Sequence, residues 1–93
     1  MSNKDNTIYL NPSLDSRKSF YKKASIRTED NKLILRSYQT DVAFIDLNTK
    51  IATVYNMYSN TTTRHIKDFL YQYEFKIGTS KEIMKMYNPN YRV

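Results

Sequence analysis

The sequence predicts an α+β domain: an antiparallel meander sheet of three to four strands, packed on one face by a helix and followed by a short C-terminal helix. Apolar and polar residues alternate with period two over most of residues 19–57, interrupted by turns that contain Asn and Asp. The period then changes to that of a helix over residues 61–73. A length of 93 residues suits a single domain, 1–93, with residues 1–6 and 88–93 expected to be flexible.

The first part of the chain contains two segments with the character of strands. Residues 7–10 predict a short edge strand, which Asn11-Pro12 ends because proline cannot donate to a strand ladder. Residues 13–18 form either one helical turn or a loop, and the sequence leaves both open. Residues 19–27 alternate between an apolar face and a basic face, the pattern of a half-buried strand.

Three further strands are predicted, over residues 32–38, 42–47 and 50–57. Because Gly78 is the one glycine of the chain, we expect the turns to use Asn and Asp in left-handed conformations. Residues 38–41 form either a tight turn or a kink in one long strand. The sequence does not decide between these two alternatives.

A helix over residues 61–73 follows from four apolar residues at helical spacing, which form one stripe that packs on the sheet. These residues are Ile66, Phe69, Leu70 and Tyr73. The residues expected on the opposite face are Arg64, Lys67, Asp68 and Tyr71.

A second, short helix begins after Thr79, which has the position of an N-cap, with Glu82 three residues later as the acid of a capping box. It is expected to extend to about Met86 and to end at Asn88-Pro89.

The composition excludes several classes of site. The chain has no cysteine and one histidine, which excludes disulfides, thiolate metal sites and most zinc sites. A glycine-rich phosphate loop is excluded as well. The sequence shows no apolar run that could span a membrane and no apolar core of a secretory signal near its start, so a cytoplasmic location is expected. We expect no cofactor, no metal and no small-molecule substrate.

The net charge of +6 indicates a polyanionic or acidic partner. The alternative is that the charge serves solubility, since its size is normal for a soluble domain.

The start of the predicted long helix carries a cluster of hydroxyl side chains followed by two basic ones. Ser59, Thr61 and Thr62 lie where the unpaired N–H groups of a helix start need acceptors. Arg64 and His65 then occupy the first turn, although a helix N-terminus favours negative charge. The cluster is therefore either simple capping, with His65 bonded to a neighbouring strand, or a pocket that receives an anion. Catalysis by His65 would need a nucleophile and an orienting acid, and nothing nearby looks like such a pair.

The solvent side of the predicted sheet is the second candidate. Tyr21, Lys23 and Arg27 alternate on one strand, and Arg36 with Tyr38 is expected on another. Aromatic rings interleaved with cations are typical of platforms for single-stranded nucleic acid, and the alternative is an ordinary solvated strand face. The candidate residues for nucleic-acid or anion binding from both regions are Lys18, Tyr21, Lys22, Lys23, Arg27, Arg36, Tyr38, Ser59, Thr61, Thr62, Arg64, His65 and Lys67.

Three blocks of the sequence resemble a family of small, mostly uncharacterised phage proteins from Gram-positive hosts. The blocks are SFYxKA at residues 19–24, LxSYxTxVAxI at residues 35–45 and SxTTxRHIxxFL at residues 59–70. The third block is the most specific, and Lys22 stands where the family usually has glycine. The resemblance implies a phage origin and brings no known reaction; small phage proteins of this size include anti-CRISPR proteins and other inhibitors of host machinery.

Two functions are consistent with these observations, and neither is enzymatic. The first is a small basic phage protein that binds nucleic acid without catalysis in the cytoplasm of an infected bacterial host. RNA is placed ahead of DNA because no recognition helix with base-reading residues is evident. The second is a protein-binding inhibitor of a host complex, such as a ribonucleoprotein CRISPR–Cas effector.

Overall fold

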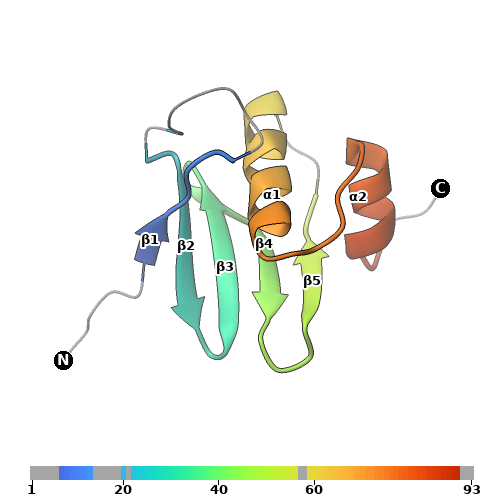
Figure 1. Ribbon diagram of the computed structural model, residues 1–93, viewed down its shortest axis with the longest axis horizontal. Helices are drawn as coiled ribbons and strands as arrows, with labels where there is room; N and C mark the ends of the chain where they lie inside the picture. Colours follow the sequence, from blue (N-terminus) through green and yellow to red (C-terminus); the bar gives the residue numbers. More distant parts are fainter. Residues whose placement is uncertain (1–6, 14–19, 21, 57–58, 91–93) are drawn as a thin grey trace.

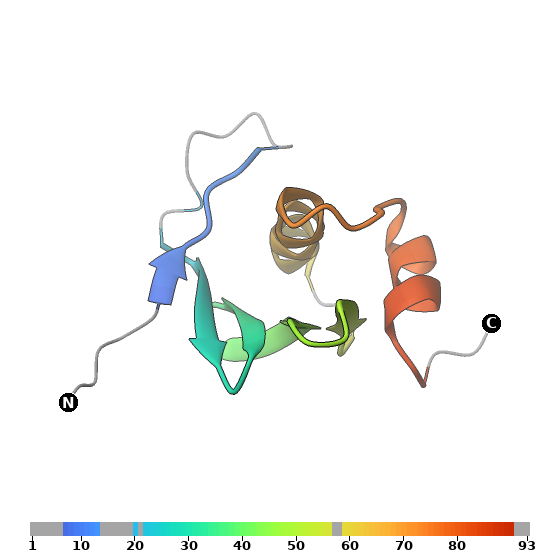
Figure 2. The same cartoon turned by 60° about the horizontal axis from the view of Figure 1, so that its bottom comes forward.

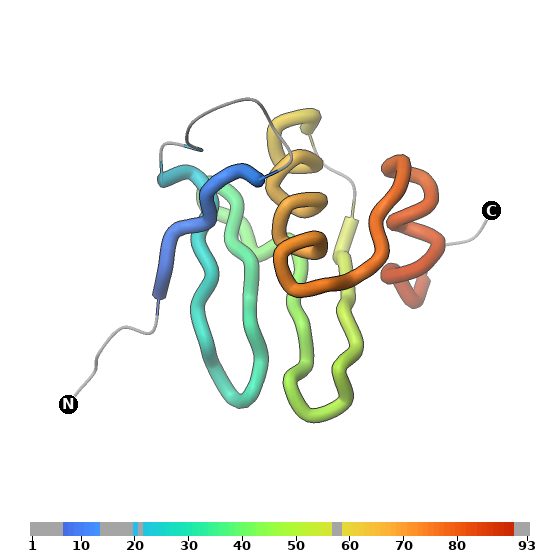
Figure 3. Tube along the Cα trace, viewed as in Figure 1, coloured from blue at the N-terminus to red at the C-terminus, as the bar shows by residue number. Residues whose placement is uncertain are grey.

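Five antiparallel strands follow one another across a single sheet in their chain order, so the chain runs up and down through neighbouring strands (Figures 1 and 3). The computed structural model describes residues 7–13, 20, 22–56 and 59–90. Its strands are β1 (Thr7–Tyr9), β2 (Ala24–Glu29), β3 (Lys32–Ser37), β4 (Thr40–Asp46) and β5 (Ile51–Val54). Its helices are α1 (Asn60–Gln72) and α2 (Ser80–Tyr87). The α+β class is confirmed, with five strands instead of three to four.

Helix α1 lies across one face of the sheet, and the opposite face carries neither helix (Figure 2). The apolar stripe of α1 packs as the sequence predicted: Ile66, Phe69 and Leu70 are fully buried. They meet the buried side chains of the strands, among them Ile26 and Leu35, which are cross-strand partners on the same face. The core therefore lies mainly between α1 and the sheet, and Ile83 and Met84 of α2 also belong to it.

The two edges of the sheet differ in how they are covered. Strand β1 is short and exposed along its length. Helix α2 lies beside β5 (Figure 1), and Ala52 and Val54 of this strand are buried. The Asn88 side chain, just beyond α2, donates to the carbonyl oxygens of Val54 and Tyr55 at 3.0 and 2.7 Å. Helix and side chain together close the β5 edge against pairing with another strand.

Among the described residues, six other than glycine adopt a left-handed backbone conformation, and they correct one prediction. Asp30 and Asn31 occupy the β2–β3 turn as expected for these residue types. The other four are Lys22, Tyr38, Lys50 and Glu74, so the turns are not restricted to Asn and Asp. Such conformations cost a side chain-bearing residue roughly 1 kcal/mol each.

The strand boundaries decide between the turn and the kink at residues 38–41, and they correct the predicted start of the strand at residue 19. Strand β3 ends at Ser37 and β4 begins at Thr40, so the chain makes a tight turn there and not a kink. Strand β2 begins at Ala24, later than residue 19, because Lys22 has a φ of 63° and the Lys23 N–H donates to the Phe20 carbonyl oxygen at 2.9 Å. These two features form a turn that delays the strand. Flexibility was predicted for residues 1–6 and 88–93, of which residues 1–6 and 91–93 lie outside the described residues. Among the described residues 88–90, the Asn88 side chain is bonded to the β5 end as noted above.

Helix α1 begins and ends with standard capping devices. The Thr62 N–H donates to Ser59 Oγ at 3.3 Å, which makes Ser59 the N-cap. At the other end the Phe75 N–H donates to the Leu70 carbonyl oxygen at 2.8 Å, and the Glu74 N–H donates to that of Tyr71 at 3.0 Å. This pair of bonds is a Schellman motif with Glu74 at the left-handed position.

Helix α2 carries the predicted capping box, with Thr79 and Glu82 bonded to each other's backbone N–H groups. Gly78 does not need a left-handed conformation. Glycine suits this position because a Cβ here would displace the Glu82 carboxylate from its place in the capping box. Across the residues that the structure describes, neither helix combines the length and apolar character needed to cross a membrane.

Candidate nucleic-acid interface

A buried polar network ties the start of α1 to the end of β3. Ser37 Oγ lies 2.9 Å from Thr62 Oγ1 and 2.8 Å from His65 Nδ1. Thr62 and His65 are buried, and the His65 ring packs edge-on against Phe20 at a centroid distance of 4.5 Å. The structural alternative for His65, a hydrogen bond to a neighbouring strand, is therefore confirmed. Both side chains face the interior and not a surface that an anion can reach.

Tyr38 covers this network from the solvent side. The turn between β3 and β4 holds it at a φ of 58°, and its N–H donates to the Lys23 carbonyl oxygen at 2.7 Å. One face of its ring lies against His65 at a centroid distance of 5.9 Å, and Lys23 Nζ is 5.7 Å from its centroid. The side chain stays 48% exposed. It is a half-exposed aromatic ring with a cation over it, on a backbone position set by the turn.

Residues from the two candidate regions, the predicted sheet surface and the start of α1, thus lie close together although they are far apart in the chain. We use the name Tyr38 end for Lys22, Lys23, Tyr38 and Arg64, which lie where the start of β2, the β3–β4 turn and the start of α1 come together (Figure 1). Lys22 Nζ lies over the ring of a second exposed tyrosine, Tyr9, at 5.6 Å from its centroid. Arg64 is exposed and precedes the buried His65 directly.

The remaining candidates fall into other places. Ser59 is the cap described above, and Thr61 and Lys67 are half-buried on α1. Lys18 and Tyr21 lie outside the described residues. Arg27 and Arg36 lie on the uncovered face of the sheet. Tyr38 follows β3 in the turn and does not lie on this face. The expectation that Arg36 and Tyr38 share this face is wrong, because the left-handed turn directs Tyr38 toward the helix side.

Arg27 is held by an intramolecular partner. Its guanidinium reaches across β3 and donates to both carboxylate oxygens of Asp41 at 2.8 Å, with a longer contact of 3.4 Å to Glu29. These hydrogen bonds hold the pKa of Asp41 below its usual range, and they raise the pKa of Arg27. Arg36 donates to the backbone and side-chain oxygens of Gln39 at 3.5 and 3.2 Å. Neither arginine is part of the Tyr38 end.

Asp68 is the polar residue whose role the sequence did not reveal. It was expected on the solvent side of α1, but it is buried. Its Oδ1 accepts from the Ser13 N–H at 2.6 Å and from Gln72 Nε2 at 3.0 Å, while Gln72 also donates to the Asn11 carbonyl oxygen at 2.7 Å. Asp68 therefore anchors the segment after β1 to the helix, a long-range contact with no local pattern.

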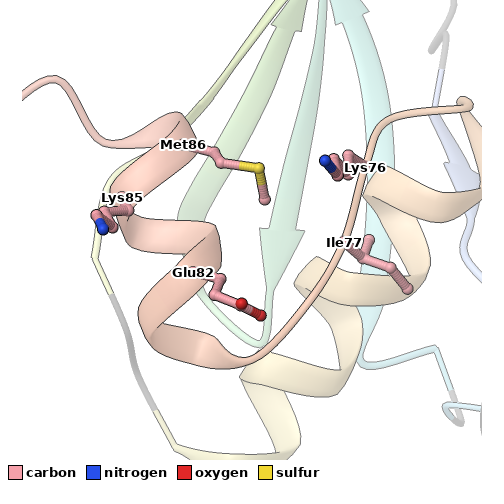
Figure 4. A pocket seen from close by; sticks show the side chains of 5 residues that line it. All are labelled: Lys76, Ile77, Glu82, Lys85 and Met86. Carbon is pink, nitrogen blue, oxygen red and sulfur yellow. The ribbon is translucent and has the colours of Figure 1, made fainter.

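A hollow of about 390 Å³ lies on another side of the molecule, between α2 and the chain that leads into it (Figure 4). Its lining consists of Lys76, Ile77, Glu82, Lys85 and Met86. The Glu82 carboxylate is already bonded to the Thr79 N–H at 2.8 Å in the capping box. The carboxylate of this hollow thus serves the helix start, and the hollow lies apart from the Tyr38 end.

Within the described ranges, no three metal-ligating side chains gather in one place. No curated protein and no solved structure gives a significant match to the chain. One protein family does match, over residues 8–86, which include every described strand and helix apart from the outermost residues of β1 and α2. The chain therefore belongs to a family of unknown function, DUF8033.

Proposed function

We propose that this protein binds single-stranded nucleic acid, RNA in preference to DNA, at the Tyr38 end. It does so without catalysis, as a small basic phage protein that interferes with or regulates a process of its bacterial host. The observation that carries the proposal is the exposed Tyr38 ring, fixed by the turn and by His65, with Lys23 beside it.

A base stacks on such a ring, and the neighbouring cations contact the phosphates on either side of that base. Because His65 and the turn already restrict Tyr38, ordering the ring on binding costs little entropy. Lys22, Lys23 and Arg64 supply positive charge, while two carboxylates of the described residues already have partners within the chain. Asp68 is buried, and Asp41 is paired with Arg27.

RNA is placed ahead of DNA because proteins that recognise RNA mostly target single-stranded segments, whose unstacked bases stack on aromatic side chains.

A protein partner is the second candidate, as an inhibitor of a host defence complex such as a CRISPR–Cas effector. Exposed tyrosines are enriched at protein interfaces, and Tyr9 and Tyr38 are both about half exposed. A ribonucleoprotein partner would present acidic surfaces or bound RNA to the same cations.

The ring is tested by Tyr38→Asn, because asparagine tolerates the left-handed conformation but cannot stack. Stacking on an aromatic ring is worth about 1–3 kcal/mol per base, so the dissociation constant for a labelled single-stranded RNA should rise roughly 5- to 150-fold. Fluorescence anisotropy measures it. Tyr71→Asn is the matched control, since Tyr71 is 50% exposed on α1 and lies outside the Tyr38 end.

Equal affinities of the Tyr38→Asn variant and the wild type for RNA would contradict the proposal. Stoichiometric capture of one host protein in the absence of RNA would favour the second candidate. Protein purified at low salt provides an earlier indication, because a nucleic-acid binder carries excess absorbance at 260 nm.

A further inference from the structure

We propose that the uncovered face of the sheet packs against the same face of a second copy of the chain, forming a two-fold symmetric, sheet-on-sheet dimer. We use the name outer face for this surface, which points away from α1 (Figure 2). Its centre is made by Lys32, Ile34 and Arg36 of β3 and by Asp41, Phe44 and Asp46 of β4.

The outer face presents apolar surface in the monomer. Phe44 lies in its middle, half-buried, with its ring 5.7 Å from that of Tyr55 and Lys32 Nζ 5.3 Å from its centroid. Ile51 on β5 is 60% exposed and Tyr55 is 48% exposed. Among the described residues, neither helix covers the Phe44 and Tyr55 rings, whereas Ile51 borders α2 in a hollow that Met86 also lines. Exposed apolar side chains grouped on one face are typical of an interaction surface.

The charges of the outer face are balanced, unlike those of the whole chain. Strands β2 to β4 place three cations and three anions on it, so its net charge is zero while that of the chain is +6. The cations are Arg27, Lys32 and Arg36, and the anions are Glu29, Asp41 and Asp46. A surface without net charge does not repel its own copy.

The register of β3 and β4 makes this surface complementary to itself. Lys32 pairs with Asp46, Ile34 with Phe44, and Arg36 with Asp41. A two-fold axis that runs parallel to the strands, midway between β3 and β4, lays β3 of one copy over β4 of the other. Lys32 then faces Asp46 of the second copy, Arg36 faces Asp41, and Ile34 faces Phe44. Each contact occurs twice, as an isologous interface requires.

The other two-fold axis in the plane of the interface is disfavoured. An axis perpendicular to the strands would lay Lys32 over Arg36 and Asp46 over Asp41, so like charges would meet. The register therefore selects the axis along the strands, which gives the aligned packing of a β-sandwich. Asp41 retains acceptor capacity, because its pair with Arg27 uses two of roughly four lone-pair sites.

The interface is small. Four strands about 4.8 Å apart and six residues long cover roughly 400 Å² of flat surface, below the about 800 Å² per partner of a standard interface. We therefore expect a dimer that dissociates on dilution. Because the axis is parallel to the strands, the two Tyr38 ends lie at the same end of the dimer. One RNA can then bind both Tyr38 ends at once, an expectation that rests on the proposed function. The dimer itself does not rest on the proposed function.

The test uses two charge reversals and sedimentation at concentrations from about 10 µM to 1 mM, where a small interface associates. The wild type should approach twice the monomer mass at the upper end. Lys32→Asp places acid opposite Asp46 of the second copy, and Asp46→Lys places a cation opposite Lys32. Each variant alone should dimerise at least about tenfold more weakly, and an equimolar mixture should form a heterodimer because both contacts are then attractive. Lys85→Asp on α2 is the control with the same change of charge.

Asp46 also accepts from the Asn48 and Thr49 N–H groups at 2.9 and 3.2 Å, so Asp46→Lys loosens the β4–β5 turn. If that variant does not fold, Lys32→Asp alone decides. A wild type that stays monomeric throughout the range overturns the proposal, as does a Lys32→Asp variant that dimerises like the wild type. A monomer in which Lys32→Asp weakens RNA binding instead shows the outer face to be a nucleic-acid surface, which also overturns it. Tyr38→Asn should leave dimerisation unchanged, so the two proposals fail separately.

Discussion

Replacing Glu74 by glycine is expected to stabilise the protein, which is unusual for a mutation at a charged residue. Glu74 occupies the left-handed position of the Schellman motif that ends α1, with a φ of 67°. Glycine is the residue that this position favours, because it has no Cβ to clash. The acid is also misplaced electrostatically, since the C-terminus of a helix favours cations.

The magnitude follows from three contributions. Relief of the left-handed conformation gains roughly 1–2 kcal/mol. The greater freedom of glycine in the unfolded chain costs about 0.5–1 kcal/mol. Removal of the carboxylate from the helix end gains about 0.3 kcal/mol. The free energy of unfolding should therefore rise by about 0.3–1.8 kcal/mol. The midpoints of these ranges give about 1 kcal/mol, or roughly 4–8 °C in thermal midpoint for a domain of this size.

Thermal unfolding followed by circular dichroism measures the change. Glu74→Ala is the control, because it removes the charge but keeps a Cβ in the left-handed conformation. The reasoning is refuted if Glu74→Gly lowers the midpoint, or if Glu74→Ala raises it by the same amount as glycine.

Four further outcomes are expected. Phe69→Ala removes a fully buried ring and should cost about 3–5 kcal/mol of unfolding free energy in denaturant titrations; a nearly unchanged midpoint would mean that the helix packs differently. Gly78→Ala should cost about 0.5–1 kcal/mol through the Glu82 capping box, and no further loss should occur in a Glu82→Ala background. Arg27 holds the pKa of Asp41 low in the folded state, so the stability that this pair contributes is present above the unfolded pKa and is lost as the pH falls through the folded pKa. In Asp41→Asn, the loss of stability below about pH 4 should therefore be smaller than in the wild type. The difference should be less than about 1 kcal/mol, because both groups are partly exposed. Arg64→Gln should leave the thermal midpoint unchanged or raise it slightly, because a cation in the first turn opposes the helix dipole by about 0.3–1 kcal/mol, and a drop of several degrees would reveal a structural role.

The parts of the fold that could be predicted rest on local patterns. The stripe of α1, the capping box of α2 and the alternation of the strands each repeat over a few residues, so periodicity shows them directly. The Ser59 cap was visible for the same reason.

The parts that could not be predicted depend on contacts distant in sequence or on unfavourable conformations. Lys22 adopts a left-handed conformation that its residue type disfavours. The turn at Lys22 is the reason why the strand predicted from residue 19 begins only at Ala24. Asp68 lies outside the apolar stripe of α1, a position typical of the surface. It is nevertheless bonded to the N–H of Ser13, which is distant in the sequence.

The candidate site was predicted as two separate regions, and the structure brings parts of them together. Neither the Lys23–Tyr38 nor the Ser59–His65 segment contains a signal for the other, since the Ser37 bond to His65 is a tertiary contact. The left-handed turn at Tyr38 moved the ring from the outer face to the helix side. No period in the sequence encodes that change of direction.

The central claim, that cations of the Tyr38 end hold phosphates, is tested most directly by the salt dependence of RNA binding. Two triple variants have the same net charge of +3, which is 6 − 3. One replaces Lys22, Lys23 and Arg64 by glutamine, and the other replaces Lys76, Lys81 and Lys85. Affinity of the wild type should fall steeply between about 50 and 200 mM salt, with the slope of log affinity against log salt set by about 0.7 per phosphate contact. The account predicts that the first triple variant loses roughly two units of this slope and the second almost none. Equal slopes for the two variants, or no binding of the wild type at low salt, would contradict it.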